Sequence, residues 1–219
     1  MTPGLMGCNH MRVSENYHSV IEKAFQRHYS EQSDVWTTDI GMRVLPLLIQ
    51  GQLRLSAESR VLDIGCGSGL DTLVYGDLSQ QVTGVDIFDH PEWRQIENTH
   101  SHIRFIHGNF LSCPLEGPYD VIIDNGCFHH QTEESLAHYL AKIHHLLPAH
   151  GHFVLSTFSD RLKSTYIDDY QRIHHYFSDE ALSAILAEAR FAVLTTLFIY
   201  RPKYGNYYRI SFCQKAAEA

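Results

Sequence analysis

Residues 61–69 read Val-Leu-Asp-Ile-Gly-Cys-Gly-Ser-Gly, a short apolar run that ends in an acid and then places glycine at every second position. The apolar run is typical of a buried parallel strand, and the glycines predict a turn where the backbone can approach a ligand without a Cβ in the way. Residues 70–75 follow as a short helix. The turn therefore joins the carboxyl end of a strand to the start of a helix, which is where open α/β sheets bind ligands.

A second strand end follows at the spacing of one strand-helix-strand unit. Residues 81–87 form another apolar run, and its acid, Asp86, lies 23 residues after Asp63. A carboxylate at this strand tip can accept both hydroxyls of a ribose, and Ile87 beside it can pack on a purine ring. The two strand ends together predict a site for a ligand that contains a nucleoside.

Two more strand ends complete the pattern. Residues 103–110 form a strand that leads to Asn109, a polar side chain placed where it can read the edge of adenine. Residues 119–130 form a strand that ends in the cluster Asp-Asn-Gly-Cys-Phe-His-His over residues 124–130. This polar and aromatic cluster lies beside the place where a ligand on the glycine turn would project.

These four segments together resemble the class I S-adenosylmethionine-dependent methyltransferases, from about Val61 to the C-terminus. The cluster over residues 124–130 is similar to a variant found in small-molecule methyltransferases with thiopurine-methyltransferase-like sequences. The resemblance implies S-adenosylmethionine as the methyl donor and S-adenosylhomocysteine as a product. It also implies an α/β fold with a Rossmann-like, doubly wound, seven-stranded sheet, mostly parallel with an antiparallel last strand, and a helical N-terminal cap.

The resemblance also implies a role for each strand end. The glycine turn would wrap the methionine half of the cofactor, Asp63 would orient its amino group, and Asp86 would hold the ribose. Asn109 departs from the family, which usually has Asp to accept from the adenine amino group, although an Asn carbonyl can still accept that bond. The residues implied in cofactor binding are Asp63, Gly65, Cys66, Gly67, Gly69, Asp86, Ile87, Asn109, Phe110, Asp124 and Asn125.

The candidate catalytic residues are His129, His130 and Asp124. Methyl transfer from a sulfonium is an in-line displacement, and alignment of two reactants can contribute about 7–11 kcal/mol. A base is needed only when the acceptor must first lose a proton, and histidine is then the usual group. We expect His129 ahead of His130, with packing under the next helix or exposure to solvent as the alternative. Asp124 fits better as an electrostatic partner of the sulfonium.

Two other functions compete with methyl transfer. A nicotinamide-dependent oxidoreductase needs Gly-x-Gly-x-x-Gly, but Leu70 stands where its third glycine would be. A regulatory or degenerate methyltransferase-fold protein would bind the cofactor without turnover. A glycine turn that binds nothing is the plainest alternative to both.

Composition favours a single domain acting on small molecules. The 219 residues carry a net charge of −8 and only 17 Lys plus Arg, without the basic stripe that nucleic-acid binding needs. No apolar run approaches the length of a membrane span, and residues 1–16 lack the pattern of a signal peptide. The five cysteines are scattered, which favours reduced thiols. We expect a cytoplasmic monomer or homodimer with no nucleic-acid or membrane partner.

Periodicity predicts strand alternating with helix, and therefore a parallel sheet with right-handed crossovers. Residues 191–200 and 207–214 differ, because only a short loop with Pro202 and Gly205 separates them. Such a loop permits a hairpin and forbids a parallel crossover, so the last strand should be antiparallel. The expected strands are 60–64, 82–86, 103–107, 119–124 and 152–158, and the expected helices are 17–32, 40–53 (interrupted near Pro46), 70–78, 91–98, 132–147 and 179–190.

The expected domains are an N-terminal helical cap over residues 1–55 and a methyltransferase domain over 56–219, forming one unit. Aromatic residues in the cap and in the segment 159–178 would cover the acceptor and exclude water. The candidate substrate residues are Tyr17, Tyr29, Trp36, Tyr166 and Tyr170. The chain has 16 histidines, but their spacing does not match a zinc site, so no metal is expected.

Overall fold

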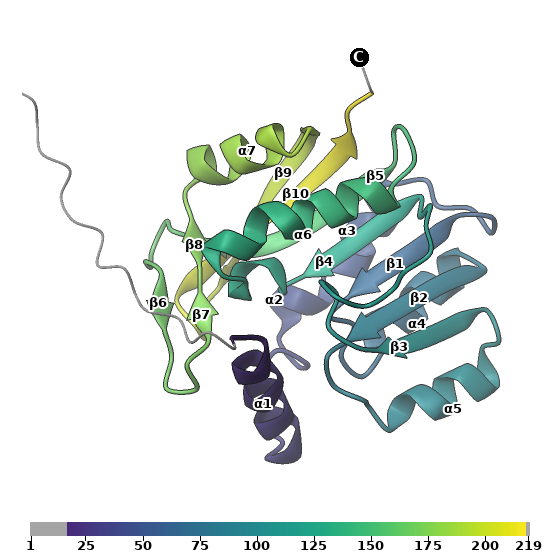
Figure 1. The fold of residues 1–219 in the computed structure, drawn as a ribbon, viewed down its shortest axis with the longest axis horizontal. Helices are drawn as coiled ribbons and strands as arrows, with labels where there is room; N and C mark the ends of the chain where they lie inside the picture. Colours follow the sequence, from purple (N-terminus) through teal and green to yellow (C-terminus); the bar gives the residue numbers. More distant parts are fainter. Residues whose placement is uncertain (1–16, 218–219) are drawn as a thin grey trace, which may run out of the picture.

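The computed structural model describes residues 17–217, which form a central sheet covered by helices on both faces (Figure 1). The strands lie in the order β3-β2-β1-β4-β5-β10-β9. The strand bounds are β1 (Arg60–Ile64), β2 (Gln81–Asp86), β3 (Ile103–His107), β4 (Val121–Asn125), β5 (His152–Ser159), β9 (Phe191–Arg201) and β10 (Asn206–Lys215). The helix bounds are α1 (Tyr17–Ser30), α2 (Ile40–Arg43), α3 (Leu45–Gln52), α4 (Leu70–Leu78), α5 (Glu92–Thr99), the 3₁₀ turn η1 (Phe128–His130), α6 (Glu133–Leu146) and α7 (Asp179–Glu188).

The directions of the strands confirm the predicted doubly wound topology. β1 pairs in parallel with β2 and β4, β3 continues the sheet in parallel beside β2, and β5 beside β4. β10 is antiparallel to both β5 and β9. The hairpin expected from the short loop around Gly205 is therefore confirmed, and it gives the sheet its reversed edge.

Two segments differ in detail from the prediction. The second helix divides at Val44, which ends α2 and begins α3, with Pro46 in the first turn of α3, where a missing N–H costs nothing. The segment after β5 carries three short strands, β6 (Tyr166–Ile167), β7 (Ile173–His174) and β8 (Tyr176–Phe177). β8 adds an eighth strand beside β5, while β6 and β7 pair only with each other.

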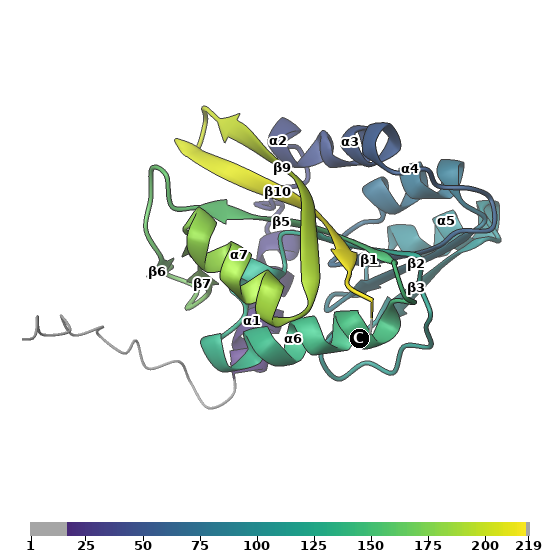
Figure 2. The ribbon, with the colours of Figure 1, turned by 90° about the horizontal axis from the view of Figure 1, so that it is seen from above.

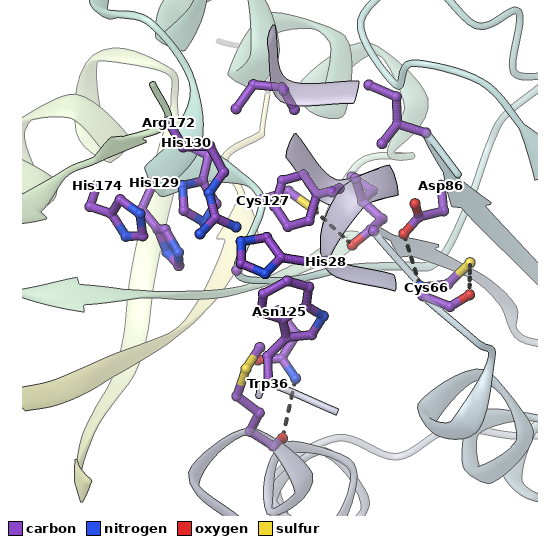
Figure 3. A pocket seen from close by; sticks show the side chains of 18 of the residues that line it. His28, Trp36, Cys66, Asp86, Asn125, Cys127, His129, His130, Arg172 and His174 are labelled. Carbon is purple, nitrogen blue, oxygen red and sulfur yellow. Dashed lines mark hydrogen bonds between the residues drawn. The ribbon is translucent and has the colours of Figure 1, made fainter. Parts of the chain in front are cut away.

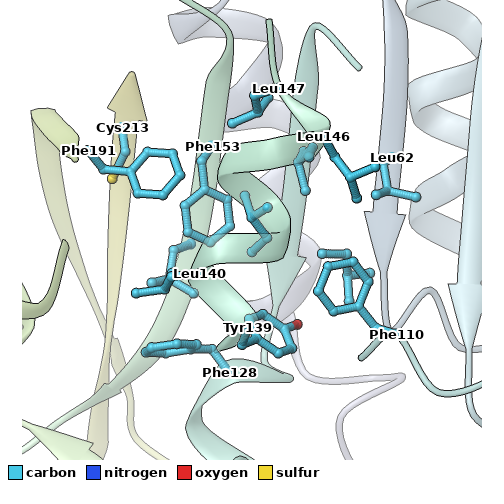
Figure 4. Packing of buried hydrophobic residues seen from close by; sticks show 14 of the residues in the cluster. Leu62, Phe110, Phe128, Tyr139, Leu140, Leu146, Leu147, Phe153, Phe191 and Cys213 are labelled. Atoms are coloured by element: carbon cyan, nitrogen blue, oxygen red, sulfur yellow. The ribbon is translucent and has the colours of Figure 1, made fainter. Parts of the chain in front are cut away.

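Helices lie on both faces of the sheet (Figure 2), and an apolar cluster on each face holds them there. On one face α6 and α7 bury residues such as Leu140 and Leu182 against Phe153 of β5. Figure 4 shows the packing of this first cluster. On the other face α3, α4 and α5 bury Leu45 and further apolar residues against the strands. Because α3 packs on the sheet itself, the second cluster continues into the segment predicted as cap. Residues 1–16 of that cap, including Cys8, lie outside the described residues.

The carboxyl ends of β1 and β4 mark the switch point of the sheet, because the chain continues from β1 to one side and returns at β4 on the other. Helix α1 lies beside this edge (Figure 1). The hydroxyl of Tyr17 donates to the carbonyl of His130 at 2.9 Å and accepts from the N–H of Ile173 at 2.8 Å. The side chain of Tyr17 thus joins α1 to η1 and to β7. These three elements border the space above the strand ends.

Within residues 17–217 no helix is both long enough and apolar enough to span a bilayer. The four cysteines of this range, Cys66, Cys113, Cys127 and Cys213, are free thiols.

Candidate active site

A cavity of about 390 Å³ opens along the carboxyl ends of the central strands. The glycine turn and the ends of β2 and β4 line one end of it, and the segment after β5 and the β9-β10 hairpin line the other. Helix α1 contributes side chains to both ends. Figure 3 shows Asp86 and Cys66 at the first end and a group of histidines with Arg172 at the second. We call the first the acidic end and the second the aromatic end.

The glycine turn is shaped so that its backbone forms the wall of the acidic end. Gly65 and Gly67 have φ of 69° and 53°, a region that side chains rarely adopt. A Cβ on Gly65 would collide with the sulfur of Cys127, and one on Gly67 would lie 3.4 Å from the hydroxyl of Tyr29. A side chain at Gly65 is therefore excluded by Cys127, whereas one at Gly67 would have space for its Cβ and would be strained by the backbone conformation.

Gly69 differs from the other two glycines. It begins α4 and faces the packed rings and methyl groups of Phe105 and Ile96. It is absent from the lining of the cavity. The predicted contact between Gly69 and a cofactor is therefore not what the structure shows, because this glycine supports the packing of α4 on the sheet instead.

Three buried carboxyl groups line the acidic end, those of Asp63, Asp71 and Asp86, and within residues 17–217 only Asp71 of these is paired with an arginine, Arg43. Asp86 accepts from the N–H of Gly67 and from that of Phe88, both at 2.9 Å, so it ties the glycine turn to the end of β2. Asp63 accepts from the hydroxyl of Thr72 at 2.6 Å. Burial raises the pKa of Asp86, and burial raises the pKa of Asp63 to about 7. A cation or a pair of hydroxyl groups placed here would meet two acceptors in a dry environment.

Asn109 stands beside Ile87 and Phe110 at the rim of the acidic end. Its amide nitrogen donates to Nδ1 of His18 at 2.8 Å, and its carbonyl oxygen accepts from the N–H of Leu111 at 2.9 Å. A carbonyl oxygen has two lone pairs, so one acceptor site on Asn109 is still available. His18 belongs to α1, and this contact joins the helix to the rim.

The structure places Asp124 outside the cavity, contrary to its predicted position beside the reacting groups. Its carboxylate accepts from the N–H groups of Gly126, Cys127 and Phe128 at 2.9, 2.7 and 3.0 Å. It also accepts from the hydroxyl of Tyr139 at 2.7 Å and is fully buried. Its side chain lies on the face of the sheet that α6 covers, so it supports the loop after β4 from below. Asn125, one residue later, does line the cavity.

His129 and His130 project from that loop into the aromatic end. Nδ1 of His130 lies 2.6 Å from the carbonyl oxygen of Ile173. Because a carbonyl can only accept, this nitrogen carries the proton, and Nε2 is left with a free lone pair. The ring of His129 packs 3.9 Å from the ring of Phe158, and its Nδ1 is buried with no hydrogen bond to the described residues. Burial lowers the pKa of both histidines well below the ordinary value, so both are neutral at pH 7.

Aromatic side chains form most of the remaining wall. Four of the five predicted substrate residues, Tyr17, Tyr29, Trp36 and Tyr166, line the cavity. Tyr170 does not line the cavity; its ring packs behind the wall residue His28, with the two ring centres 4.4 Å apart. Further wall residues are His28, Met42, Phe158, His174, Tyr176 and Tyr208.

Three arginines in the wall, Arg43, Arg172 and Arg201, were not predicted from the sequence. Arg43 lies 2.8 Å from Asp71 of α4. Arg172 is buried against Asp168, and Arg201 is buried against Asp39. Burial raises the pKa of Asp168, but its bonds to His174 and Arg172 outweigh this and lower the pKa to about 2. The spacing of four residues between Asp168 and Arg172, inside an aromatic segment, is the signal that points to this pair. Arg201 and Asp39 are 162 positions apart, so no local pattern indicates their pairing.

Among the histidine, cysteine and acidic residues of the described range, no three lie close enough to hold a metal ion.

Comparison with known proteins places the chain in a family. Residues 38–196 match the family model described as a methyltransferase domain. An uncharacterized methyltransferase of Staphylococcus carnosus is 31% identical over 134 residues, which cover 60% of this chain and 64% of that protein. An uncharacterized methyltransferase of Schizosaccharomyces pombe is 29% identical over 113 residues, which cover 50% of this chain and 78% of the relative.

A solved structure resembles nearly the whole chain. The 1,6-didemethyltoxoflavin-N1-methyltransferase of Burkholderia thailandensis, with bound 1,6-didemethyltoxoflavin and S-adenosylhomocysteine, has a TM-score of 0.86 and 29% identity. The similarity covers 99% of this chain and 94% of that one. The [4+2]-cyclase SpnF, with 16% identity and a TM-score of 0.68, shares the fold alone. With its glycine turn, its acidic strand ends and a family match over more than half its length, the chain belongs to the class I S-adenosylmethionine-dependent methyltransferases.

Proposed function

We propose that this protein transfers the methyl group of S-adenosylmethionine to a nitrogen, oxygen or sulfur atom of a small planar molecule. One observation carries the proposal: a single cavity joins the acidic glycine turn to an aromatic end that contains neutral histidines. A ring nitrogen is the favoured acceptor, because the Burkholderia thailandensis protein is named as an N1-methyltransferase and holds a heterocycle together with S-adenosylhomocysteine.

The acidic end fits the cofactor part by part. Asp86 would hold the ribose hydroxyls, Ile87 would lie on the adenine, and the free acceptor site of Asn109 would take its amino group. Gly65 and Gly67 line the cavity with backbone alone, so the methionine chain would lie along the turn without a side chain in the way. When bound, the cofactor supplies an electrophilic methyl group on a sulfonium. The protein would align the two reactants, exclude water and remove the proton of the acceptor.

His130 is the better candidate for the base, which reverses the order expected from the sequence. Its tautomer is set by the carbonyl of Ile173, so the nitrogen that faces away from this bond is the unprotonated one. His129 has no such partner on Nδ1. A histidine with a lowered pKa is a weak base, but it is always in its basic form near pH 7.

The competing functions make different demands on this site. A nicotinamide enzyme needs its third glycine at the position of Leu70, and a nucleic-acid enzyme needs a basic surface, which a net charge of −8 disfavours. A cofactor-binding protein without turnover would share the acidic end and differ only in the absence of methyl transfer. Binding and turnover are therefore tested separately.

The first test is binding. S-adenosylhomocysteine should raise the melting temperature of the protein in proportion to the logarithm of its concentration, because a ligand that binds only the folded state stabilises it by mass action. NAD and NADP serve as the controls and should leave melting unchanged. A shift with the nicotinamide cofactors and none with S-adenosylhomocysteine would contradict the proposed function.

The second test concerns Asp86. The Asp86→Ala variant should bind S-adenosylhomocysteine roughly 10- to 150-fold more weakly, the effect of losing about 1.5–3 kcal/mol from hydrogen bonds to a charged group. Its melting temperature without ligand should also fall, because the N–H groups of Gly67 and Phe88 lose their acceptor. Asp77→Ala, which changes an exposed acid on α4, is the matched control. Calorimetric titration that gives equal affinities for the two variants would remove Asp86 from the site.

The third test separates catalysis from binding. With 1,6-didemethyltoxoflavin as trial acceptor, His130→Gln should keep the affinity for S-adenosylhomocysteine and lower turnover by roughly 10²- to 10⁴-fold, the usual contribution of a base. The His129→Gln variant should show a smaller loss of turnover than His130→Gln. Because the pKa of His130 is lowered, its basic form persists as pH falls, so wild-type kcat/KM should stay level between about pH 8 and about pH 6.5. A full rate in His130→Gln would leave alignment as the main contribution.

A further inference from the structure

Arg172 is a buried cation in the wall of the aromatic end, and its hydrogen bonds are incomplete. Its Nε and Nη2 both lie 2.8 Å from Oδ2 of Asp168, and its side chain is 8% exposed. Within residues 17–217 no hydrogen bond reaches its Nη1. A guanidinium has five N–H donors in a rigid planar fork, so the pair with Asp168 leaves donors unused. Since Arg172 lines the cavity, these donors are available to a ligand.

In the ion pair of Arg172 and Asp168, only Arg172 has hydrogen-bonding groups that a ligand could reach. Asp168 is occupied, because it also accepts from Nε2 of His174 at 2.9 Å and from the N–H of Tyr170. The other titratable groups that interact with Arg172 are neutral phenols and imidazoles: Tyr17 and His28 of α1, His130 of η1, and Tyr166 and His174 of the β6-β7 pair. The guanidinium carbon lies 5.2 Å from the ring of Phe25 and 5.7 Å from that of Trp36, so aromatic faces hold it in place.

Arg172 and His130 offer opposite hydrogen-bonding groups to the same molecule. They lie close together at the aromatic end (Figure 3), and the backbone supports this, because the next residue, Ile173, accepts from the His130 ring. His130 presents a lone pair and needs a donor from the ligand. Arg172 presents N–H groups and needs an acceptor. A ring N–H beside a carbonyl group, the edge of a lactam or an imide, satisfies both at once.

We propose that Arg172 binds a carbonyl oxygen of the methyl acceptor, and that the acceptor is a planar lactam or imide with its reacting N–H beside that oxygen. The inference rests on the proposed function and names its substrate class. His130 takes the proton of the ring N–H, and the electron pair left behind is shared between nitrogen and oxygen. Arg172 stabilises the charge on the oxygen. The nitrogen then forms a bond to the methyl carbon as the carbon–sulfur bond breaks, which leaves a neutral thioether, a neutral N-methyl product and a proton that passes from His130 to solvent.

The test compares two probes of the same shape on the protein saturated with S-adenosylhomocysteine. Lumazine is a flat bicycle with ring N–H groups beside carbonyls, and pteridine has the same rings without them. By calorimetric titration lumazine should bind more tightly to the wild type. Arg172→Met should weaken lumazine roughly 10- to 100-fold, as expected for a hydrogen bond to a charged group, and abolish the preference.

Arg161→Met is the matched control. Arg161 lies after the same strand β5, forms an ion pair with Asp179 at 2.8 Å and is absent from the lining of the cavity. This variant should keep the preference for lumazine. Arg172→Met combined with Asp168→Asn removes the pair without leaving a buried anion, and it carries the test if the single variant fails to fold.

The outcomes separate the inference from the proposed function. Equal binding of the two probes to the wild type, or a preference that persists in Arg172→Met, would overturn the role of Arg172 while binding of S-adenosylhomocysteine supports the methyltransferase. A wild type that does not bind S-adenosylhomocysteine would overturn the proposed function, and the inference with it.

Discussion

The carboxylate of Asp124 holds three consecutive backbone N–H groups, and the shape of the cavity depends on this contact. It turns the loop after β4 so that Cys127 packs against Gly65 and the two histidines point into the aromatic end. Tyr139 of α6 completes the bonds of the carboxylate, so the loop is fixed to the core of the domain. A site that aligns two small reactants needs this rigidity, because misplacement of about 1 Å can cost roughly 100-fold in rate.

Charge is distributed so that each end of the cavity fits a different partner. The acidic end holds Asp63 and Asp86, whose pKa values burial raises, so a bound cation would meet acceptors that lack competing water. At the aromatic end each buried arginine is balanced by an aspartate, and the histidines are neutral. A neutral, flat molecule can enter such an environment without leaving an unpaired charge behind. The distribution of charge therefore favours a cationic donor at one end and an uncharged acceptor at the other.

Much of the fold and of the acidic end could be predicted from the sequence, because both depend on local patterns. Periodicity gave α4 and β1 with their bounds, and the short loop before β10 required the antiparallel edge. The prediction that Asp124 lies beside the reacting groups was wrong. Side chains alternate between the two faces of a strand, and that of Asp124 lies with Ile122 on the face that α6 covers. The aromatic end was only partly predictable. Its contacts join distant segments, such as Tyr17 with Ile173, 156 positions later.

The central claim is that one cavity holds the methyl donor against the loop after β4. The most direct measurement is ultraviolet cross-linking of the whole chain to S-adenosylmethionine labelled in its methyl group, followed by proteolysis and mass spectrometry of the labelled peptides. We expect label in residues 63–67 or 125–130, and an excess of unlabelled S-adenosylhomocysteine should suppress it. Label that appears elsewhere in the chain and persists in the presence of S-adenosylhomocysteine would contradict the claim.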